Sequence, residues 1–568
     1  MASGSNSKGL PVVIIGAGIS GICMAVDLIR RNGTRNFIIL EKSSDAGGTW
    51  NDNRYPGCCA DAWSHLYSFS FNPNPNWMCN YPTQREIHAY LISTVRQWDL
   101  FKHIVFNTAV ESAKWSDTEM VWRIVVTSTS NDKKEECHQD TIITPFLVSA
   151  VGQLSIPSIP DIAGLDDFKA KVMHSSRWDE SQELKGKRIA IFGNGATGIQ
   201  MIPEIAKLAS HLTVFQRTPN WVLPRNNQNI SLAQRLIYKF FPHIRERYRE
   251  RLMVSQDQVH DMIIKPEVGE FVKSLSLDMM KRQIPENGIL REKLTPNYPY
   301  GCKRVILSDE FFPTMNQPHV KLETRPVDHI TERGILIDGE ETDFDILILA
   351  TGFRTTEFMH GINIVGNDGR DIREIWRQGG RAYLGMTVES LPNFAMLYGP
   401  NTNLSHSSVL LMIESQARYI SAMIGTIQSA VSSAENLVFT VKKERVEAFN
   451  QELQLRLHET VFAHPGCSSW YKTKDNIVTN NWPERAAKYQ QMLMVLDWND
   501  YEILGTWPKG CSKTDIKHFG LPIEEELKTR FPTRYILGIL GISSLCMAIW
   551  RYRRWAKVLN GQRTGIIE

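Results

Sequence analysis

The first predicted supersecondary unit lies near the N-terminal end of the chain, where two apolar runs frame a glycine-rich turn. The apolar strand Val12–Ile15 leads into the turn, residues 22–30 have a helical pattern, and the apolar strand Phe37–Leu40 ends at Glu41. The turn has the spacing GxGxxG, with Gly16, Gly18 and Gly21. Strand, tight turn and helix in this order bring a pyrophosphate to a helix N-terminus, and Glu41 can accept a hydrogen bond from a ribose hydroxyl. The pattern therefore predicts a dinucleotide-binding site.

A second unit of the same kind begins at residue 188. The run Arg188–Phe192, apolar from residue 189 on, leads into a turn with glycines at Gly193, Gly195 and Gly198, and a helical pattern follows to about residue 208. The next apolar strand, at 212–215, is followed by Arg217 and Thr218 rather than by an acid. A guanidinium and a hydroxyl at this place suit a 2′-phosphate, which favours NADPH over NADH. Arg217 is also compatible with an ordinary solvated surface residue.

The remaining patterns indicate an α/β protein with two Rossmann-like dinucleotide-binding domains and a helical insert. Apolar strands at 142–150 and 344–349 predict the points where the chain crosses between the two domains, and residues 226–299 have helical patterns with mixed charge and no strand. We expect residues 1–165 and 354–525 to form the two parts of the first domain, residues 166–225 and 300–353 the second domain, and residues 226–299 the insert.

The C-terminal end carries a segment of a different kind. Residues 535–550 contain no charged residue and lie between Arg534 and Arg551. As a helix, sixteen residues span about 24 Å, short of a hydrocarbon core of about 30 Å, although the flanking arginines and Trp550 suit a membrane interface. The segment is thus a candidate membrane helix, transmembrane or interfacial, and a buried C-terminal helix is the alternative.

Composition and charge narrow the function classes further. The chain has 568 residues, with 64 Lys and Arg against 61 Asp and Glu, so its net charge of +3 does not point to nucleic acid as a partner. Its nine cysteines are scattered and include no CxxC pair, which indicates neither a disulfide framework nor a thiolate metal site. We therefore expect no metal and an intracellular, reducing setting.

Two longer motifs resemble those of a known enzyme family. Residues 47–61 read GGTWNDNRYPGCCAD, which is similar to the GGTWxxxRYPGxxxD segment of Baeyer–Villiger monooxygenases, a group of FAD- and NADPH-dependent flavoprotein monooxygenases. Residues 168–179 resemble the FxGxxxHxxxW signature of the same family, with Ala170 where the family usually has glycine. The marker residues of this domain-linking motif are Phe168, His174 and Trp178. The resemblance covers about residues 10–500 and leaves the apolar tail outside.

The resemblance implies a reaction and two cofactors. An enzyme of this family uses NADPH and FAD to insert one oxygen atom of O2 beside a ketone or aldehyde carbonyl, giving an ester or lactone through a C4a-peroxyflavin. The first domain is then expected to bind FAD and the second NADPH. Beyond the glycine turn and Glu41, the residues implied to contact FAD are Gly48, Thr49, Trp50, Asp61 and Tyr67.

The resemblance also implies roles at the reacting centre. Arg304, in the sequence Gly-Cys-Lys-Arg, would stabilise the peroxyflavin, and Asp61 would orient Arg304. Lys303 would share the 2′-phosphate of NADPH with Arg217 and Thr218, and Trp470 would reach the nicotinamide cofactor.

Two other functions stay open at this point. One is a flavin-containing N- or S-monooxygenase, and the other is a non-catalytic, membrane-tethered flavoprotein. For the main interpretation the partners are O2 and a small ketone. An apolar ketone would suit an enzyme anchored to a membrane by residues 535–550, with its catalytic domains in the cytosol.

Overall fold

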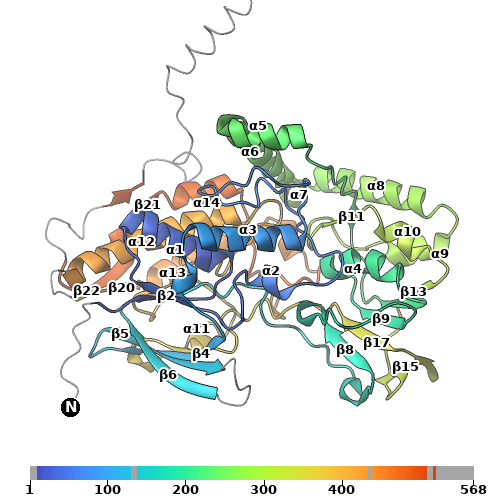
Figure 1. The fold of residues 1–568 in the computed structure, drawn as a ribbon, viewed down its shortest axis with the longest axis horizontal. Coiled ribbons are helices and arrows are strands. Elements are labelled where there is room, and N and C mark those ends of the chain that lie inside the picture. Colours follow the sequence, from blue (N-terminus) through green and yellow to red (C-terminus); the bar gives the residue numbers. More distant parts are fainter. Residues whose placement is uncertain (1–8, 130–136, 433–435, 508–515, 520–568) are drawn as a thin grey trace, which may run out of the picture.

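A computed structural model of the chain describes residues 9–129, 137–432, 436–507 and 516–519. Figure 1 shows two α/β lobes side by side, each built around a sheet, with helices α5 and α6 projecting above them. The α/β class that the sequence predicts is confirmed.

The first lobe is centred on a five-stranded sheet in the order β19-β7-β1-β2-β3, in which all neighbouring strands are parallel. All four residues of β1 are buried, as expected for a parallel strand covered on both faces. The strands are β1 (Val12–Ile15), β2 (Phe37–Leu40), β3 (Ile104–Val105), β7 (Leu147–Ser149) and β19 (Phe394–Met396).

Successive side chains of β1 face two different layers. Val12 and Ile14 belong to a core shared with the helices α1 (Ile19–Asn32) and α12 (Leu410–Ser432). Val13 and Ile15 belong to a second core, shared with a four-stranded sheet in the order β18-β4-β5-β6. That sheet consists of β4 (Thr108–Ser116), β5 (Val121–Thr129), β6 (Cys137–Thr144) and β18 (Asn363–Val365). The alternation places one layer on each face of the parallel sheet.

The C-terminal third of the chain packs onto the same lobe. Strand β20 (Leu437–Val441) pairs with β22 (Tyr501–Gly505), and buried residues of both belong to the core that contains α1. Asn393, just before β19, donates through Nδ2 to the carbonyl oxygens of Pro145 and Leu437, at 3.1 Å each. The other elements of this part are α3 (Gln84–Gln97), α11 (Ile372–Ile375), α13 (Lys443–His458), α14 (Ala486–Met492), β21 (Val495–Leu496) and β23 (Lys517–His518).

The second lobe has its own five-stranded parallel sheet, in the order β13-β10-β9-β17-β8. Its strands are β8 (Lys171–His174), β9 (Arg188–Phe192), β10 (His211–Phe215), β13 (Val320–Glu323) and β17 (Ile346–Leu349). Helices α4 (Ala196–Ala206) and α10 (Phe311–Met315) contribute to a core on one face. The small sheet of β14 (His329–Ile330), β15 (Gly334–Ile337) and β16 (Glu340–Asp343) contributes to the core on the other.

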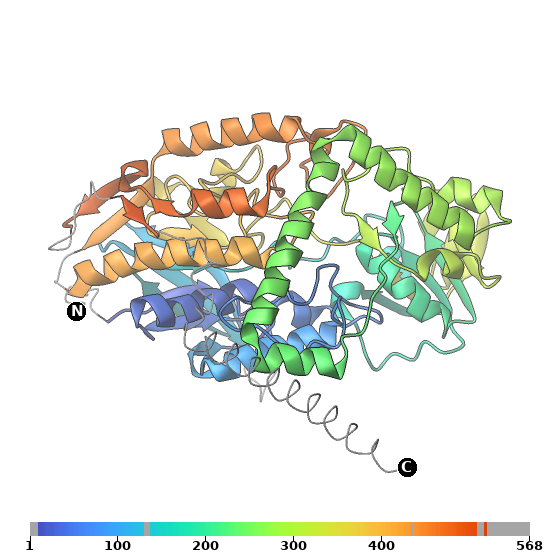
Figure 2. The ribbon, with the colours of Figure 1, turned by 90° about the horizontal axis from the view of Figure 1, so that it is seen from above.

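Residues 232–294 form helices, and one of them reaches the first lobe. These helices are α5 (Leu232–Phe240), α6 (Pro242–Val259), α7 (Asp261–Ile264), α8 (Pro266–Gln283) and α9 (Gly288–Leu294). The short strands β11 (Val222–Leu223) and β12 (Ile306–Leu307) pair where the chain enters and leaves the helices. In Figure 2 the long green helix α6 runs across the boundary between the lobes. Its Arg249 donates to the carbonyl oxygens of His65 and Ser68, the latter at 2.9 Å.

The candidate membrane helix at 535–550 lies outside the described residues. Within the described part of the chain, no helix combines the length and the apolar character needed to cross a bilayer.

The close packing of α1 on β1 yields a prediction for Gly21. A Cβ atom at this position would lie 1.9 Å from the carbonyl oxygen of Gly16. We expect Gly21→Ala to lower the free energy of unfolding by about 3 kcal/mol or more, because backbone atoms must move to relieve the overlap. Urea unfolding followed by circular dichroism measures the loss. The control is Gly195→Ala, because a Cβ there meets no atom within 4 Å; equal midpoints for the two variants would contradict the prediction.

Candidate functional site

A first cavity, of about 370 Å³, opens at the carboxyl ends of β1 and β2. Six of the residues predicted to contact FAD line it: Gly16, Gly18, Glu41, Gly48, Thr49 and Tyr67. Trp50 is buried behind this wall and donates through Nε1 to the Tyr67 hydroxyl at 3.1 Å. The two other predicted residues do not line this cavity. Gly21 packs against the glycine turn, and Asp61 lines a second cavity.

The backbone around the first cavity fits a dinucleotide such as FAD. Gly48 has φ +54°, and a Cβ on it would lie 2.9 Å from the Cα of Gly18, so the two turns approach more closely than side chains allow. The N-cap of α1 is Gly18, without a side-chain cap, which leaves the first-turn amides for a phosphate. The Glu41 carboxylate is held by the backbone N–H groups of Ala17 and Ser43, at 2.7 and 2.8 Å.

The second glycine turn repeats this arrangement in the other lobe. A Cβ on Gly198 would lie 2.3 Å from the carbonyl oxygen of Gly193, so α4 packs closely on β9. The N-cap of α4 is Gly195, again without a side-chain cap, and the space beside it is open. A second pyrophosphate fits this helix N-terminus.

Two cations come together beside this turn. Lys303 donates through Nζ to the Thr218 hydroxyl at 3.0 Å and lies over the Tyr298 ring. Burial lowers the pKa of Lys303, and the nearby charge of Arg217 lowers it further. Arg217 itself is exposed. Because a phosphate would relieve the repulsion between the two cations, the geometry suits the 2′-phosphate of NADPH.

The ion pair between Asp61 and Arg304 joins the lobes. Arg304 donates through Nε to Oδ2 at 2.8 Å and through Nη2 to Oδ1 at 2.5 Å, and its Nη1 donates to the carbonyl oxygen of Leu404 at 3.2 Å. Burial acts to raise the pKa of Asp61, but the charge and hydrogen bonds of Arg304 outweigh it and lower that pKa. Burial likewise acts to lower the pKa of Arg304, and Asp61 raises it. Both groups therefore stay charged.

The second cavity, of about 200 Å³, contains this ion pair. Lys303 also lines it, together with residues of α6 and α7 and the segment 405–408. Trp470 lines neither cavity, although its carbonyl oxygen accepts from the hydroxyl of Thr355, which lines the first. The structure thus brings Asp61, Lys303 and Arg304 together at one cavity, and Trp470 is not among the residues that line it.

The three residues of the domain-linking motif have structural contacts. Phe168 is buried in the core beside the small sheet, and Trp178 packs against the other core of the second lobe. His174 donates through Nε2 to the carbonyl oxygen of Gly352 at 3.0 Å and accepts through Nδ1 from the backbone N–H of Ser176. Burial lowers the pKa of His174. The ring therefore connects the ends of β8 and β17 as a neutral group.

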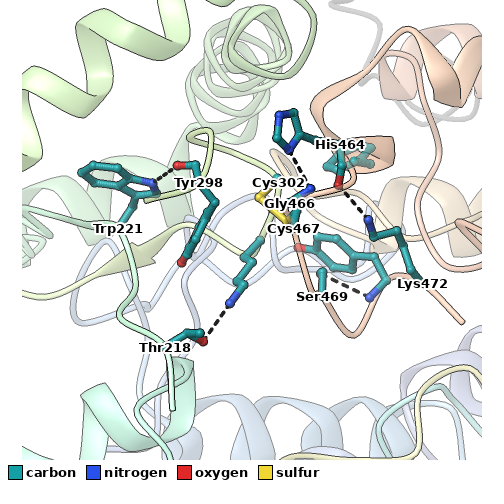
Figure 3. Close-up of a disulfide and its surroundings, with 12 residues drawn as sticks. Thr218, Trp221, Tyr298, Cys302, His464, Gly466, Cys467, Ser469 and Lys472 are labelled. Atoms are coloured by element: carbon teal, nitrogen blue, oxygen red, sulfur yellow. Dashed lines mark hydrogen bonds between the residues drawn. A yellow bond between two sulfur atoms is a disulfide. The ribbon is translucent and has the colours of Figure 1, made fainter. Parts of the chain in front are cut away.

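A disulfide between Cys302 and Cys467 corrects one expectation from the sequence. Both cysteines are buried, their Cα atoms lie 6.2 Å apart, and 165 residues separate them in the sequence. Figure 3 shows that the bond connects the segment carrying Tyr298 with the segment that carries Ser469 and Lys472. The expectation of no disulfide is wrong for this pair, because spacing along the chain reports only local cysteine pairs and the folded chain brings these two loops together. The bond joins the neighbour of Lys303 to the segment of Trp470.

Sequence reasoning assigned no role to several residues at the cavities. The segment 405–408 lines the second cavity next to Arg304, and its signal is a polar Ser-His-Ser-Ser run ahead of the apolar helix α12. Gln153, in the first cavity, donates to the carbonyl oxygens of Tyr398 and Gly399 at 3.0 and 3.1 Å. Nothing in the local pattern singles out Gln153.

Comparisons with known proteins agree with this geometry. The sequence model of a family described as flavin-binding monooxygenase-like matches residues 9–363. The chain is 43% identical, over 96% of its length and 90% of the relative's, to FAD-binding monooxygenase ktnD of Aspergillus niger. It is 36% identical, over 88% of its length and 93% of the relative's, to a Baeyer–Villiger monooxygenase of Streptomyces coelicolor. A crystal structure of OTEMO in complex with FAD and NADP superposes with a TM-score of 0.75 at 26% identity, covering 87% of this chain and 99% of that one.

The convergence of Arg217 and Lys303 predicts the cofactor preference. We expect Arg217→Ala to raise the KM for NADPH at least tenfold and to change the KM for NADH by less than about twofold, because NADH lacks the 2′-phosphate. Steady-state oxidation of each nucleotide gives both constants. Arg325→Ala, an exposed arginine paired with Glu323, is the control. Equal effects of Arg217→Ala on the two nucleotides would refute the 2′-phosphate role.

The disulfide yields a separate prediction. We expect Cys467→Ser to lower the free energy of unfolding by about 2–5 kcal/mol, because the bond closes a long loop in the unfolded chain. A reductant should lower the melting temperature of the wild-type chain and leave that of the variant unchanged. Cys79→Ser, which changes a free cysteine, is the control. Peptide mapping without reduction should recover the peptides of Cys302 and Cys467 as one species, and their recovery as free thiols would contradict the bond.

Proposed function

The chain belongs to the flavin-binding monooxygenase-like family and is an FAD- and NADPH-dependent Baeyer–Villiger monooxygenase, and from that premise we propose how its own residues serve the reaction. The overall reaction converts a ketone, O2, NADPH and a proton into an ester or lactone, NADP⁺ and water. The observation that carries the proposal is the bidentate Asp61–Arg304 pair in the second cavity.

The first cavity would hold FAD through backbone groups and one carboxylate. The uncapped N-terminus of α1 would bind the pyrophosphate, and Glu41, oriented by two backbone amides, would accept from the ribose. When bound, FAD takes a hydride from NADPH and activates O2. Glycines 16, 18 and 48 leave room for the cofactor, and Trp50 positions Tyr67 at the cavity wall.

Arg304 would supply a fixed positive charge where negative charge develops on oxygen during attack on the substrate carbonyl. Asp61 holds the guanidinium by two hydrogen bonds, so the charge needs no reorientation at the moment of reaction. Burial raises the pKa of Tyr67 and of Tyr398, while the charge of Arg304 acts in the opposite direction on both. Both tyrosines line the first cavity, so the charge of Arg304, which lines the second cavity, also acts on the wall of the first.

The second lobe would hold NADPH. The uncapped N-terminus of α4 would take the pyrophosphate, and Lys303, Thr218 and Arg217 the 2′-phosphate. The role of Trp470 at the nicotinamide rests on its motif, and the disulfide next to Lys303 supports it by keeping the two segments together. His174, Phe168 and Trp178 would link the lobes, and no proton transfer is assigned to them.

The division into domains is part of the proposal. The two parallel sheets and the core shared by β1 and β20 support an FAD domain at 1–165 and 354–525, an NADPH domain at 166–225 and 300–353, and a helical insert at 226–299. Membrane association through residues 535–550 stays a prediction of the sequence alone.

Replacing Arg304 separates two parts of the reaction. We expect Arg304→Ala to bleach the flavin absorbance on addition of NADPH within about threefold of the wild-type rate, and to form ester at least 100-fold more slowly, because the fixed charge acts after the hydride transfer. Anaerobic stopped-flow absorbance gives the first rate, and gas chromatography of the ester gives the second.

Two companion variants test how the charge is held. Asp61→Asn keeps the shape of the side chain but loses its charge, and we expect it to slow ester formation by a smaller factor than Arg304→Ala. Arg188→Ala, at an exposed ion pair with Asp345, should behave as wild type. Normal ester formation by Arg304→Ala would show that another cation does this work, and N- or S-oxides as the sole products of a broad substrate panel would contradict the Baeyer–Villiger reaction.

A further inference from the structure

The second cavity has a polar wall that the scheme above does not use. Ser405, His406 and Ser407, here called the polar wall, line it on the side of the segment before α12. Apolar side chains line the same cavity, among them Leu66 from the first lobe and Val259 and Met262 from the insert. A bound ketone would therefore meet both apolar and polar side chains.

The polar atoms of this wall have no hydrogen-bond partner among the described residues. These atoms are the hydroxyl oxygens of Ser405 and Ser407 and both ring nitrogens of His406. The side chain of His406 is 2% exposed, and the nearest carboxylate oxygen, Oδ1 of Asp257, is 3.7 Å from its Nε2, beyond hydrogen-bond distance. Buried polar groups in native proteins are nearly always paired, so these atoms leave hydrogen bonds that a ligand in the cavity can make.

The polar wall directly follows Leu404, whose carbonyl oxygen Arg304 contacts. Nη1 of Arg304 donates to the carbonyl oxygen of Leu404 at 3.2 Å, and Ser405 is the next residue. A ketone with its carbonyl beside Arg304 thus presents its nearby substituents to the polar wall. His260 packs on His406 with ring centroids 5.3 Å apart. Nε2 of His260 donates to the carbonyl oxygen of Pro483 at 2.8 Å, so the ring that supports His406 is itself held in place.

We propose that the polar wall recognises a hydroxyl group on the substrate, so that the preferred substrates are hydroxylated ketones with an apolar body. This inference rests on the proposed function and deepens it. A neutral imidazole has one donor and one acceptor, and each serine hydroxyl can do both, which matches a hydroxyl group that also donates and accepts. A carboxylate fits less well, because the carboxylate of Asp257 already lies 3.7 Å from Nε2 of His406. The apolar ketone expected from the C-terminal tail is replaced by an amphipathic one.

The test compares pairs of ligands that differ in one group. The probes are 2′-, 3′- and 4′-hydroxyacetophenone and the three corresponding methylacetophenones, each added to the full chain loaded with FAD. Binding is measured as the ligand-induced rise in melting temperature over a concentration series, and turnover as the aryl acetate formed with NADPH and O2. Binding and product formation are thus recorded independently.

We expect at least one hydroxy isomer to bind at least tenfold more tightly than its methyl counterpart. His406→Leu should lower that ratio at least tenfold, and Ser407→Ala, a milder change, should lower it several-fold. His319→Leu is the matched control, because its ring is part-buried, donates to the carbonyl oxygen of Ala206 and lines neither cavity. It should keep the wild-type ratio.

Two results would overturn the proposal. One is wild-type binding of all three methyl ketones as tight as that of the hydroxy ketones, and the other is an unchanged ratio in both His406→Leu and Ser407→Ala. A hydroxyl preference in binding without any aryl acetate would support the recognition site and contradict the proposed reaction. Aryl acetate formation without a preference would contradict the recognition site alone.

Discussion

The geometry of the second cavity depends on the ion pair between Asp61 and Arg304. The two residues are 243 positions apart and come from different lobes, and the same guanidinium also holds the backbone of Leu404. Removing one partner of this part-buried ion pair leaves an uncompensated charge, and the two hydrogen bonds of the intact pair fix the angle between guanidinium and carboxylate. This contact therefore helps to hold the lobes together at the cavity and presents a fixed positive charge there.

Three further contacts join separate stretches of the chain. The disulfide between Cys302 and Cys467 connects the loop before Arg304 to the C-terminal part, His174 connects the ends of two strands, and Arg249 connects the insert to the first lobe. Each link comes from a different stretch of the chain. The cavity therefore has walls from both lobes and the insert, and its shape depends on how all of them pack.

The two cavities differ in how their polar groups are paired, and this difference corresponds to their roles. In the first cavity, Glu41 is already oriented by two backbone amides, and most of the binding surface is glycine backbone. Such a site suits a cofactor that every member of a family shares. In the second cavity, the polar atoms of Ser405, His406 and Ser407 have no partner among the described residues. A ligand that supplies the missing hydrogen-bond partners binds more tightly than one that does not. The polar wall is therefore expected to select the substrate.

The sequence by itself determined the parts of this protein that local spacing encodes. The apolar run Val12–Ile15, the glycines at 16, 18 and 21, and their repeat from residue 188 are local patterns, which neighbouring residues impose on the backbone. Motif resemblance also indicated Asp61, Lys303 and Arg304, which the fold does bring together. Only the tertiary structure decided that Cys302 meets Cys467, that Trp470 lines neither cavity, and that the ring nitrogens of His406, at the cavity of Arg304, have no hydrogen-bond partner among the described residues. These contacts join residues that are far apart in the sequence. A local sequence pattern cannot predict them, because they follow from the packing of the whole chain.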